Sequence, residues 1–409
     1  MTEAARETPD VPVWARQEAF PESLPGWGWV DPKGRRHVCE SASALISAIR
    51  TDRDARVILA WTPDHPHMIL PEELSGAEDA ILVARKRFAS EDLLDAWDKL
   101  RWYGFLFGGM VLYMFYQGWV HAPANAETAA RASFALRTVS TSVSVGITLL
   151  MFLIFAFIPW YQARKRTREI AHWTSENVAA AVPSLRFETW LEAQKAPVTR
   201  CLLGLIGLVG LAQLFPGDSL HSAGLVKPAY HAGQWWRLLT APFLHGNPLH
   251  FLLNASALLY LGKRVEVFAR WPHVPLVFVF AACIGGELSA RLVPAPSVGA
   301  SGGLMGLLGF LLVFESLHSR LVPRSASRRL LAGVALTAFI GLIGYRFIDN
   351  AAHAGGLLAG MVYAIIVFPK SASAYRPNTT FSDRIAGSAA LALLVLAALF
   401  AVWLILRVN

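Results

Sequence analysis

The most constraining feature of this sequence is a series of apolar segments whose lengths approach the thickness of a membrane. A helix needs roughly 20 apolar residues to cross a bilayer. Of the 409 residues, 54% are hydrophobic and only 16% are charged, whereas a soluble domain carries about a quarter charged residues. This composition excludes a disordered chain, a disulfide-stapled domain and an ordinary soluble enzyme, so we predict an all-α polytopic membrane protein. The nine predicted segments are 102–121, 139–161, 199–216, 248–262, 272–290, 300–317, 329–346, 351–369 and 386–407.

Basic residues between the segments indicate how the chain is oriented. With the N-terminus in the cytoplasm and alternating segments, 22 Lys and Arg residues from Arg85 onward fall inside and 7 fall outside. The opposite orientation would break the positive-inside rule. The opening residues also lack the apolar run of a signal peptide. We therefore expect a protein of the plasma (inner) membrane, with its N-terminus in the cytoplasm and its C-terminus outside. The outside set is Arg131, Arg137, Lys227, Arg237, Arg291, Arg346 and Arg407.

The net charge of +8 could suggest a nucleic-acid partner. The basic residues lie between apolar segments, however, so we expect no nucleic acid and interpret the charge as contact with anionic lipid headgroups.

Residues 1–100 are a separate, acidic part of the chain, with 18 acidic and 12 basic residues. We expect a small soluble α+β domain in the cytoplasm. Three histidines in it, His37, His65 and His67, are interpreted as solvated loop residues, because no Cys or further His spacing supports a metal site. The predicted elements are two strands within 26–38 around an Asp31-Pro32-Lys33-Gly34 turn, a helix over 41–50, a strand within 57–61, and helices over 71–88 and 90–100.

Polar residues gather at the beginnings of three segments that all run from outside to inside. Each of these residues, taken alone, can be explained by a purely structural role, such as a serine that donates a hydrogen bond back to its own helix. Together, Ser301 and His353 supply a nucleophile and a general base, the minimum pair for nucleophilic hydrolysis. His250 and Asn254 lie four residues apart on one helical face and can both donate hydrogen bonds to an oxyanion. The alternating topology places all four at one depth near the outer face.

Neighbouring residues favour the same geometry. The Asn247-Pro248 pair predicts a helix that begins just before His250. Small residues four apart let membrane helices approach closely, which would bring His353 within reach of Ser301. Ordinary small-residue packing explains such glycines but not the polar residues beside them. The glycines concerned are Gly302, Gly306 and Gly309 in the sixth segment and Gly356 and Gly360 in the eighth.

Two other interpretations of these motifs are weaker. Residues 299–303 fit the Gly-x-Ser-x-Gly motif of the α/β-hydrolases, but that motif requires a preceding strand, and a Pro-containing loop precedes it here. Asp349 could be a third member of a triad, yet a carboxylate at a helix start is favoured by the helix dipole. The three cysteines are too few for a disulfide framework and are interpreted as free thiols.

The combined motifs resemble the rhomboid family of intramembrane serine proteases, of the bacterial type. The resemblance covers about 197–370 and implies a six-helix core. Its motifs are Trp235-Trp236-Arg237, residues 245–254, 262–266, 299–302 and 350–356, in family order. The predicted organisation is a soluble acidic domain (1–100), two extra transmembrane helices with a basic cytoplasmic linker (101–196), the rhomboid protease core (197–370), and a linker with an additional transmembrane helix (371–409).

The resemblance implies an endopeptidase that cleaves transmembrane or juxtamembrane segments of membrane proteins near the outer face. Ser301 would be the nucleophile and His353 the general base and acid. The oxyanion would be held by the Ser301 N–H, His250 and Asn254. No metal or organic cofactor is implied. Supporting positions are Gly299, Gly302, Trp236, Arg237, His245 and Gly356.

One position departs from the family pattern. Family members can carry an aromatic residue one turn after the serine, stacked on the catalytic histidine, whereas this chain has Met305. A thioether can also pack against a ring, so activity remains compatible with this residue.

Two other functions compete with proteolysis. An inactive rhomboid relative would bind membrane proteins without cutting them, but loss of the serine or the histidine would mark that class, and both are present. A transporter often carries ionisable residues within the membrane. Glu287 is the clearest such residue here, but no inverted repeat is evident.

Overall fold

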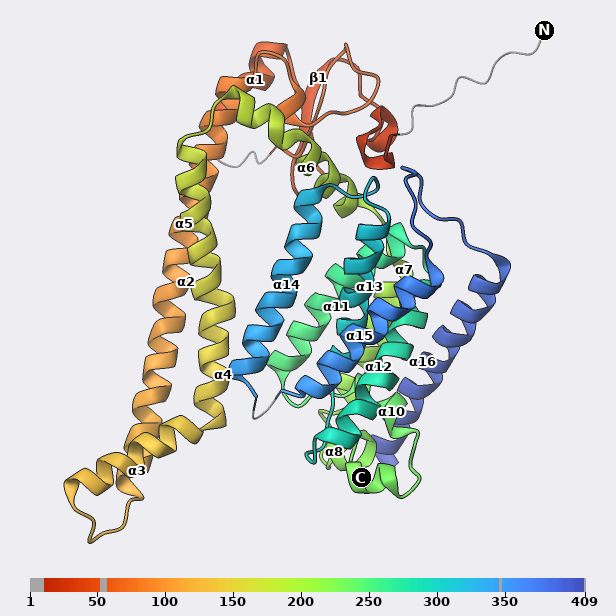
Figure 1. The fold of residues 1–409 in the computed structure, drawn as a ribbon. Coiled ribbons are helices and arrows are strands. Elements are labelled where there is room, and N and C mark those ends of the chain that lie inside the picture. Colours follow the sequence, from red (N-terminus) through yellow and green to blue (C-terminus); the bar gives the residue numbers. More distant parts are fainter. Residues whose placement is uncertain (1–10, 52–56, 346–347, 408–409) are drawn as a thin grey trace. The chain divides into compact units, whose positions relative to one another are not determined.

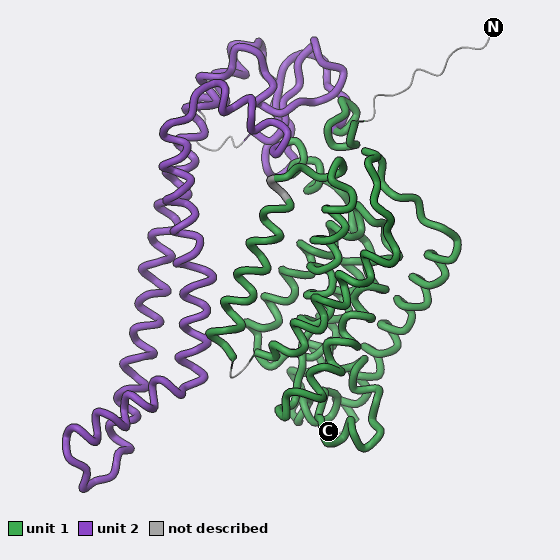
Figure 2. Tube along the Cα trace, viewed as in Figure 1, with its two compact units in different colours: residues 1–19, 186–409 green, residues 20–185 purple. Residues whose placement is uncertain are grey.

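The computed structural model describes residues 11–51, 57–345 and 348–407. The chain divides into two compact units, each dominated by helices (Figures 1 and 2). Unit 1 comprises residues 1–19 and 186–409, and unit 2 comprises residues 20–185. Predictions that concern residues 1–10 or Arg346 lie outside the described residues.

Unit 2 contains the predicted three-stranded sheet. The central strand β1 (Trp27–Val30) pairs antiparallel with β2 (Arg36–Cys39) on one side and with β3 (Leu59–Trp61) on the other. The turn between β1 and β2 is closed by Asp31, whose Oδ1 accepts the backbone N–H groups of Lys33 at 2.9 Å and Arg35 at 2.8 Å. A short polar side chain that bonds the backbone two residues on is a typical turn former. The predicted hairpin and third strand are therefore confirmed.

The sheet is covered by helix α1 (Ala42–Thr51), which begins at the predicted position. Ser41 Oγ accepts the N–H of Ala44 at 3.2 Å, as an N-cap does. Leu45 and Ile49 are buried in one core with Trp29 from the sheet. This core confirms a small α+β arrangement.

The three histidines of this region make separate contacts. His37 stacks on Trp29 with 4.0 Å between ring centroids. His65 Nδ1 lies 2.8 Å from Thr62 Oγ1, and His67 Nδ1 lies 3.1 Å from the carbonyl oxygen of Phe20. Within the described ranges, no group of three or more His, Cys, Asp or Glu residues is placed to hold a metal ion.

One long helix, α2 (Glu78–Val120), takes the place of several predicted segments. The predicted helices 71–88 and 90–100 were wrong as separate elements: residues 71–73 form a short 3₁₀ turn, and residues 78–100 form one helix with the apolar segment 102–121. The physical reason is that no Gly or Pro stands between Glu78 and Tyr103 to interrupt the helix.

Helix α2 is followed by three further helices and a π-helical turn within unit 2. The predicted start at residue 139 was wrong, because Ser142 breaks the helix and N-caps α4, accepting from the N–H of Val145 at 3.4 Å. Phe107 stacks on Phe152 with 6.0 Å between centroids, while Trp102 and Phe105 are exposed apolar residues that suit a lipid environment. The elements are α3 (Thr128–Thr141), α4 (Val143–Phe152), a π-helical turn (Leu153–Phe157) and α5 (Ile158–Ala171); α6 (Ser175–Ala193) crosses into unit 1.

Unit 1 is built around α13 (Ser301–Leu317), which packs against α11, α12, α14 and α15. This helix is buried along most of its length, so its apolar character on every side reflects a central place. The other elements are the 3₁₀ turns Val13–Ala15, Gln17–Ala19 and Ala241–Phe243, and the helices α7 (Pro197–Ala212), α8 (Ser219–Ala223), α9 (Lys227–His231), α10 (Arg237–Thr240), α11 (Pro248–Phe268), α12 (His273–Leu292), α14 (Arg324–Ile343), α15 (Asn350–Val367) and α16 (Phe381–Arg407).

Two buried polar contacts tie the core of unit 1 together and account for part of the 262–266 motif. Arg264 donates to Glu315 of α13 at 2.6 Å, and both side chains are 1% exposed. Glu266 accepts the N–H groups of Val198 and Thr199 at the start of α7, at 3.0 and 2.8 Å. A carboxylate at a helix N-terminus satisfies unpaired N–H groups and interacts favourably with the helix dipole.

Within the described residues each predicted membrane segment overlaps at least one helix, but few of these helices are long and apolar enough to span a bilayer alone. Among the described residues four qualify, or five if the bent pair α6 and α7 forms one span. Helix α13 is apolar but has only 17 residues. The prediction of a helical multi-pass protein is confirmed, and the count of nine spans stays a prediction.

Candidate active site

Ser301 is the first residue of the central helix α13. The preceding Gly299 has a φ of 122°, a conformation that favours glycine, and its N–H donates to the carbonyl of Ala241 at 3.0 Å. The first N–H groups of any helix lack acceptors within that helix. No side chain caps this helix start. The Ser301 hydroxyl therefore lies at the positive end of the α13 dipole, among free backbone donors.

His250 and Asn254 approach this loop from α11. As predicted, Asn247 N-caps the helix, accepting the N–H of His250 at 2.9 Å, and Pro248 occupies the first turn. A Cβ placed on Gly299 would lie 2.7 Å from His250 Nε2 and 3.4 Å from Asn254 Nδ2. Asn254 is 5% exposed, and its Nδ2 has no hydrogen-bond partner among the described residues. Two side-chain donors thus converge on the backbone two residues before Ser301.

His353 lies one turn into α15, and glycines bring this helix against α13. A Cβ on Gly356 would overlap the carbonyl oxygen of Gly302, and one on Gly360 would overlap that of Gly306. The predicted close approach of the two helices is confirmed. Within the described residues no hydrogen bond joins Ser301 Oγ to the His353 ring, so the structure brings their helix starts together without linking the two side chains.

A cluster of four further polar residues lies beside these helix starts. Lys227 Nζ donates to Ser289 Oγ at 2.6 Å and to Ser297 Oγ at 2.7 Å, and both hydroxyls donate to Asp349 Oδ2. Asp349 also N-caps α15, accepting the N–H of Ala352 at 2.9 Å, which confirms its predicted place at a helix start.

The cluster is charged and largely buried. Burial lowers the pKa of Lys227 to about 8, against the opposing effect of the Asp349 charge. Burial also raises the pKa of the Asp349 carboxyl, but hydrogen bonds from Ser289, Ser297 and the Ala352 N–H, with the charge of Lys227, lower it more, and the net pKa lies below its ordinary value. A small cavity of about 40 Å³ is lined by Ser289, Ser297 and Asp349 together with Ser301 and Gly302.

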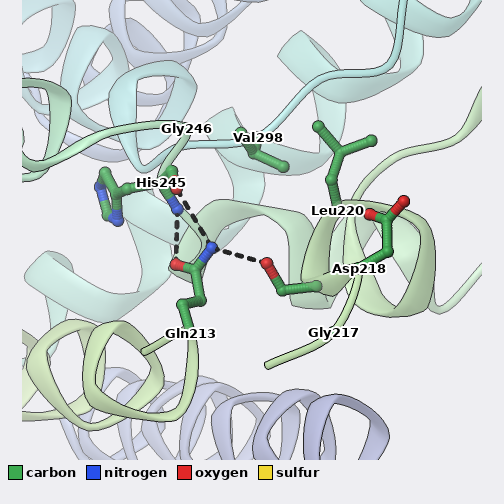
Figure 3. A pocket seen from close by; sticks show the side chains of 8 residues that line it. Gln213, Gly217, Asp218, Leu220, His245, Gly246 and Val298 are labelled. Atoms are coloured by element: carbon green, nitrogen blue, oxygen red, sulfur yellow. Dashed lines mark hydrogen bonds between the residues drawn. The ribbon is translucent and has the colours of Figure 1, made fainter. Parts of the chain in front are cut away.

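A second pocket, of about 380 Å³, lies around His245 and Val298 (Figure 3). Gln213 holds the main chain of His245: its Oε1 accepts the His245 N–H at 2.9 Å and its Nε2 donates to the His245 carbonyl at 3.1 Å. The His245 ring meets the His250 ring edge-on, with 5.1 Å between centroids. Burial and the charge of His250 lower the pKa of His245 to about 4, so this ring is neutral at physiological pH.

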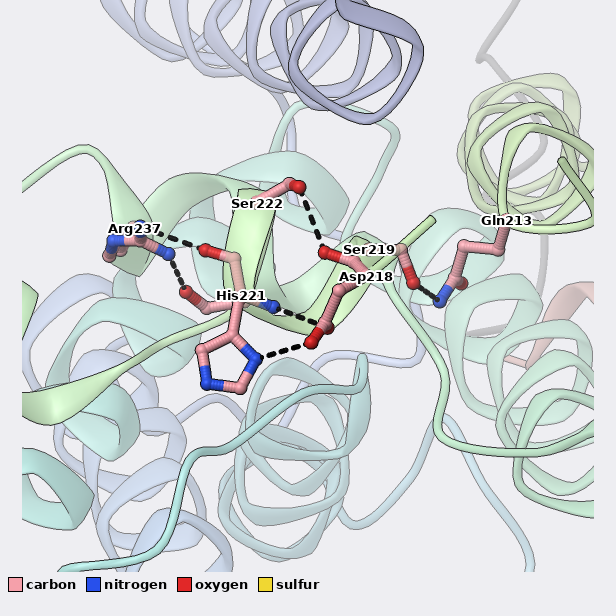
Figure 4. A network of polar contacts seen from close by, with 7 residues as sticks. Gln213, Asp218, Ser219, His221, Ser222 and Arg237 are labelled. Atoms are coloured by element: carbon pink, nitrogen blue, oxygen red, sulfur yellow. Dashed lines mark hydrogen bonds and ion pairs between the residues drawn. The ribbon is translucent and has the colours of Figure 1, made fainter. Parts of the chain in front are cut away.

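Trp236 and Arg237 make contacts with the segment that contains α8 and with α16. Arg237 is buried and donates to the carbonyls of Gly224 at 2.6 Å and His221 at 3.0 Å (Figure 4). Trp236 lies under the Arg237 guanidinium and meets Phe400 of α16 edge-on. These contacts connect the start of α10 to the end of α8 and to α16.

Glu287 and Met305, two residues singled out from the sequence, have the following surroundings in the structure. Glu287 forms an ion pair with Arg291 at 2.6 Å and accepts from the Tyr230 hydroxyl, near the C-terminal end of α12. Met305 is buried on α13. Sequence reasoning missed Gln213, Ser289 and Ser297 altogether and treated Lys227 only as an outside charge. The available signal was a lysine within an apolar loop together with an aspartate at a predicted helix start.

The fold and the site define a helical, multi-pass membrane protein whose polar residues meet at the starts of neighbouring helices. Residues 232–370 match the family model described as the Rhomboid domain. Over these residues the chain is similar to the rhomboid family.

Several characterised proteins are similar to this chain. It is 33% identical over 153 residues to RHOMBOID-like protein 6, mitochondrial, of Arabidopsis thaliana, covering 36% of this chain and 49% of the relative. It is 32% identical to Rhomboid protease GluP of Bacillus subtilis, covering 35% and 28% of the two chains. It is 28% identical to Rhomboid protease GlpG of Haemophilus influenzae, covering 42% and 92%. The chain thus spans half or less of the first two relatives and most of the third.

Proposed function

We propose that this chain is an intramembrane serine endopeptidase that cleaves transmembrane or juxtamembrane segments of membrane proteins by a Ser301–His353 dyad. The observation that carries the proposal is the convergence of the unpaired Asn254 amide and the His250 ring on Gly299, two residues before Ser301. A buried donor without a partner is costly for folding. A developing negative charge beside Ser301 is the partner that such a donor fits.

The chemistry follows from the positions of these groups. Ser301 Oγ attacks the peptide carbonyl carbon while the His353 ring accepts the hydroxyl proton. The carbonyl oxygen becomes an oxyanion, stabilised by His250, Asn254 and the backbone N–H of Ser301. His353 then returns the proton to the leaving amine, and the C–N bond breaks to leave an ester on Ser301. Water, deprotonated by His353, hydrolyses that ester and restores the hydroxyl.

The relatives and the loop residues support the same reaction. Two relatives carry the name rhomboid protease, and the residues that match the Rhomboid domain, 232–370, include the four groups. Gly299, Gly302 and Gly356 keep the approach to Ser301 narrow. Trp236, Arg237 and His245 shape the outer loop beside it. We propose transmembrane proteins as substrates, membrane lipids as the surroundings, and no cofactor or nucleic acid.

The decisive test is cleavage of a single-span substrate by the purified full chain in liposomes. We expect the wild-type chain to cut and Ser301→Ala to be inactive at equal protein level. A wild-type chain that binds the substrate but leaves it intact would favour a non-cleaving rhomboid relative. Solute flux without cleavage would favour the transporter.

We propose that the chain is oriented with its N-terminus in the cytoplasm and its C-terminus outside, in the plasma (inner) membrane. The distribution of Lys and Arg supports this orientation. Residues 1–100 would form a cytoplasmic domain, 101–196 two additional spans and a linker, 197–370 the protease core, and 371–409 a further span. Reporter fusions at the two termini test the orientation. Active reporters in one and the same compartment would show that the number of spans is even.

A further inference from the structure

Four polar side chains from separate parts of unit 1 meet beside the two proposed catalytic residues. Lys227 begins α9, Ser289 lies on α12, Ser297 lies in the loop that leads to α13, and Asp349 caps α15. Hydrogen bonds connect Lys227 to both serines and both serines to Asp349. Lys227 is 4% exposed and Ser289 is fully buried. We call these four residues the polar clasp.

The order of donors and acceptors in the polar clasp is set by chemistry. An ammonium group only donates and a carboxylate only accepts, whereas a hydroxyl does both. Each serine therefore accepts from Lys227 and gives its single proton to Asp349. This order makes the two hydroxyls a bridge between a buried cation and a buried anion. Removal of either charge leaves the other uncompensated in a low-dielectric site.

The position of the polar clasp connects it to the reacting groups. Ser297 stands four residues before Ser301, and Asp349 stands four residues before His353. The main chain of Ser297 is also paired with Leu225, with N–O distances of 3.0 and 3.1 Å. In the same loop between α12 and α13, residues 294–296 are exposed, whereas Ser297 is partly buried. Ser297 thus anchors this loop to the helix start that carries His353.

We propose that Lys227, Ser289, Ser297 and Asp349 are positioning residues that hold the Ser301 loop in register with the first turn of α15. This inference rests on the proposed function, because it assigns the spacing between Ser301 and His353 to the polar clasp. No hydrogen bond joins those two side chains in the described structure, so their spacing depends on the elements that carry them. A misplacement of about 1 Å can cost on the order of 100-fold in rate.

The test uses Ser297→Ala, Ser297→Thr and Asp349→Asn in the full chain in liposomes, with kcat and KM measured on one single-span substrate. Asparagine retains the N-cap but removes the charge. We expect kcat to fall about tenfold or more for Ser297→Ala and Asp349→Asn, with KM within about twofold, because the loss concerns alignment. Ser297→Thr, which keeps the hydroxyl, should restore most of kcat. Ser222→Ala and Asp218→Asn are matched controls in the outer loop, where Ser222 bonds the Asp218 carbonyl and Asp218 caps α8.

A second measurement separates positioning from folding. The rate at which a fluorophosphonate labels Ser301 reports its reactivity without a protein substrate. We expect this rate to fall in both Ser297→Ala and Asp349→Asn. Thermal unfolding should stay close to that of the controls in Ser297→Ala, which keeps both charges, whereas Asp349→Asn leaves Lys227 uncompensated and should also lower the unfolding temperature. The double variant Lys227→Met/Asp349→Asn should lose less kcat than the two single losses combined, because it leaves no unpaired charge.

The outcomes distinguish this inference from the proposed function. Wild-type kcat and labelling in Ser297→Ala and Asp349→Asn, with Ser301→Ala inactive, would overturn the inference alone. A fall in kcat of Ser297→Ala that is accompanied by a fall in its unfolding temperature, without rescue by Ser297→Thr, would also overturn the inference. The polar clasp would then contribute to folding only. Cleavage by Ser301→Ala, or none by the wild-type chain, would overturn the proposed function and the inference with it.

Discussion

The amide nitrogen of Asn254 lies 3.4 Å from the place that a Cβ of Gly299 would occupy, buried and without a hydrogen-bond partner among the described residues. Only glycine fits there, since Gly299 has a φ of 122° and a Cβ would collide with the His250 ring. Gly299 therefore leaves space at this point, and the Asn254 amide provides a free hydrogen-bond donor beside it. This point lies beside the first residue of α13, where a tetrahedral oxyanion would form.

We expect Asn254→Ala to lower kcat more than it changes KM, because the donor acts on charge that develops in the transition state. Loss of such a donor typically costs about 100- to 1,000-fold in rate, and the remaining donors would keep the loss toward the lower end. The measurement is steady-state cleavage in liposomes. Asn254→Asp is the size-matched comparison and should be impaired as well. Normal turnover in Asn254→Ala would contradict the assignment.

The dyad predicts non-additive effects. Ser301→Ala and His353→Ala should each abolish cleavage, and the double variant should be little worse than either, because the two residues act as one unit. Ser222→Ala and His221→Ala, two outer-loop substitutions of the same types, should cleave normally. Product formation is quantified at equal protein levels. Substantial cleavage by either single dyad variant would remove the dyad.

Gly356→Ala should destabilise the protein, although alanine is the better helix former. Alanine improves helix propensity by about 1 kcal/mol over glycine, but its Cβ would overlap the Gly302 carbonyl oxygen and push α15 away from α13. We expect a lower unfolding temperature and reduced cleavage. Gly204→Ala in α7, where a Cβ meets nothing within 4 Å, should be neutral or stabilising. Equal unfolding temperatures for the two variants would argue against close packing of α13 on α15.

The pH dependence of kcat should contain a step near the pKa of Lys227, which burial lowers to about 8. Above that pH the folded chain loses the cation that donates to Ser289 and Ser297, so we expect kcat to fall. Asp349 is the charged partner of this lysine, and His353 and His250 are the nearby groups that titrate in the proposed site.

Unfolding would not explain such a loss. The folded pKa of Lys227 lies below its ordinary value of 10.5, so between about pH 8 and 10.5 the unfolded chain binds more protons. This group therefore makes the folded state more stable as the pH rises through that window. Lys227→Met should lack the step in kcat, and an unchanged pH profile in this variant would contradict the prediction.

Substrate cleavage should depend on local unwinding near the outer face. A peptide bond inside an intact helix is shielded by its own hydrogen bonds, and Gly or Pro lowers the cost of unwinding by about 1 or 3 kcal/mol relative to Ala. We expect a small residue before the cut, because glycine-mediated packing leaves little space around Ser301. Mass spectrometry of a single-span substrate locates the cut. Two substrate variants test this prediction: one has Phe before the cut, and the other has Leu in place of the nearby Gly or Pro. Undiminished cleavage of both variants would contradict the prediction. A cut on the cytoplasmic side would contradict the proposed orientation.

Local sequence patterns predicted much of the structure correctly where a short-range interaction decides the outcome. The Asn247-Pro248 start of α11, the Asp31 turn and the Asp349 cap all depend on bonds within a few residues. The break predicted near Ser90 was wrong, because no residue there opposes helix continuation and the apolar segment that follows extends the same helix. The break at Ser142 was missed because the apolar pattern continues on both sides of it, although serine is preferred at an N-cap over a helix interior.

By itself, the sequence determined which segments are helical, which residues cap them, and which polar side chains stand near helix starts, since these follow from periodicity, composition and local hydrogen bonding. Tertiary structure alone decided that Lys227, Ser289, Ser297 and Asp349 meet beside Ser301, because their hydrogen bonds join residues separated by up to 70 positions along the chain. It also decided that Asn254 faces Gly299 with an unpaired nitrogen. Such contacts depend on how helices cross and how closely glycines let them approach, and no local pattern encodes that distance.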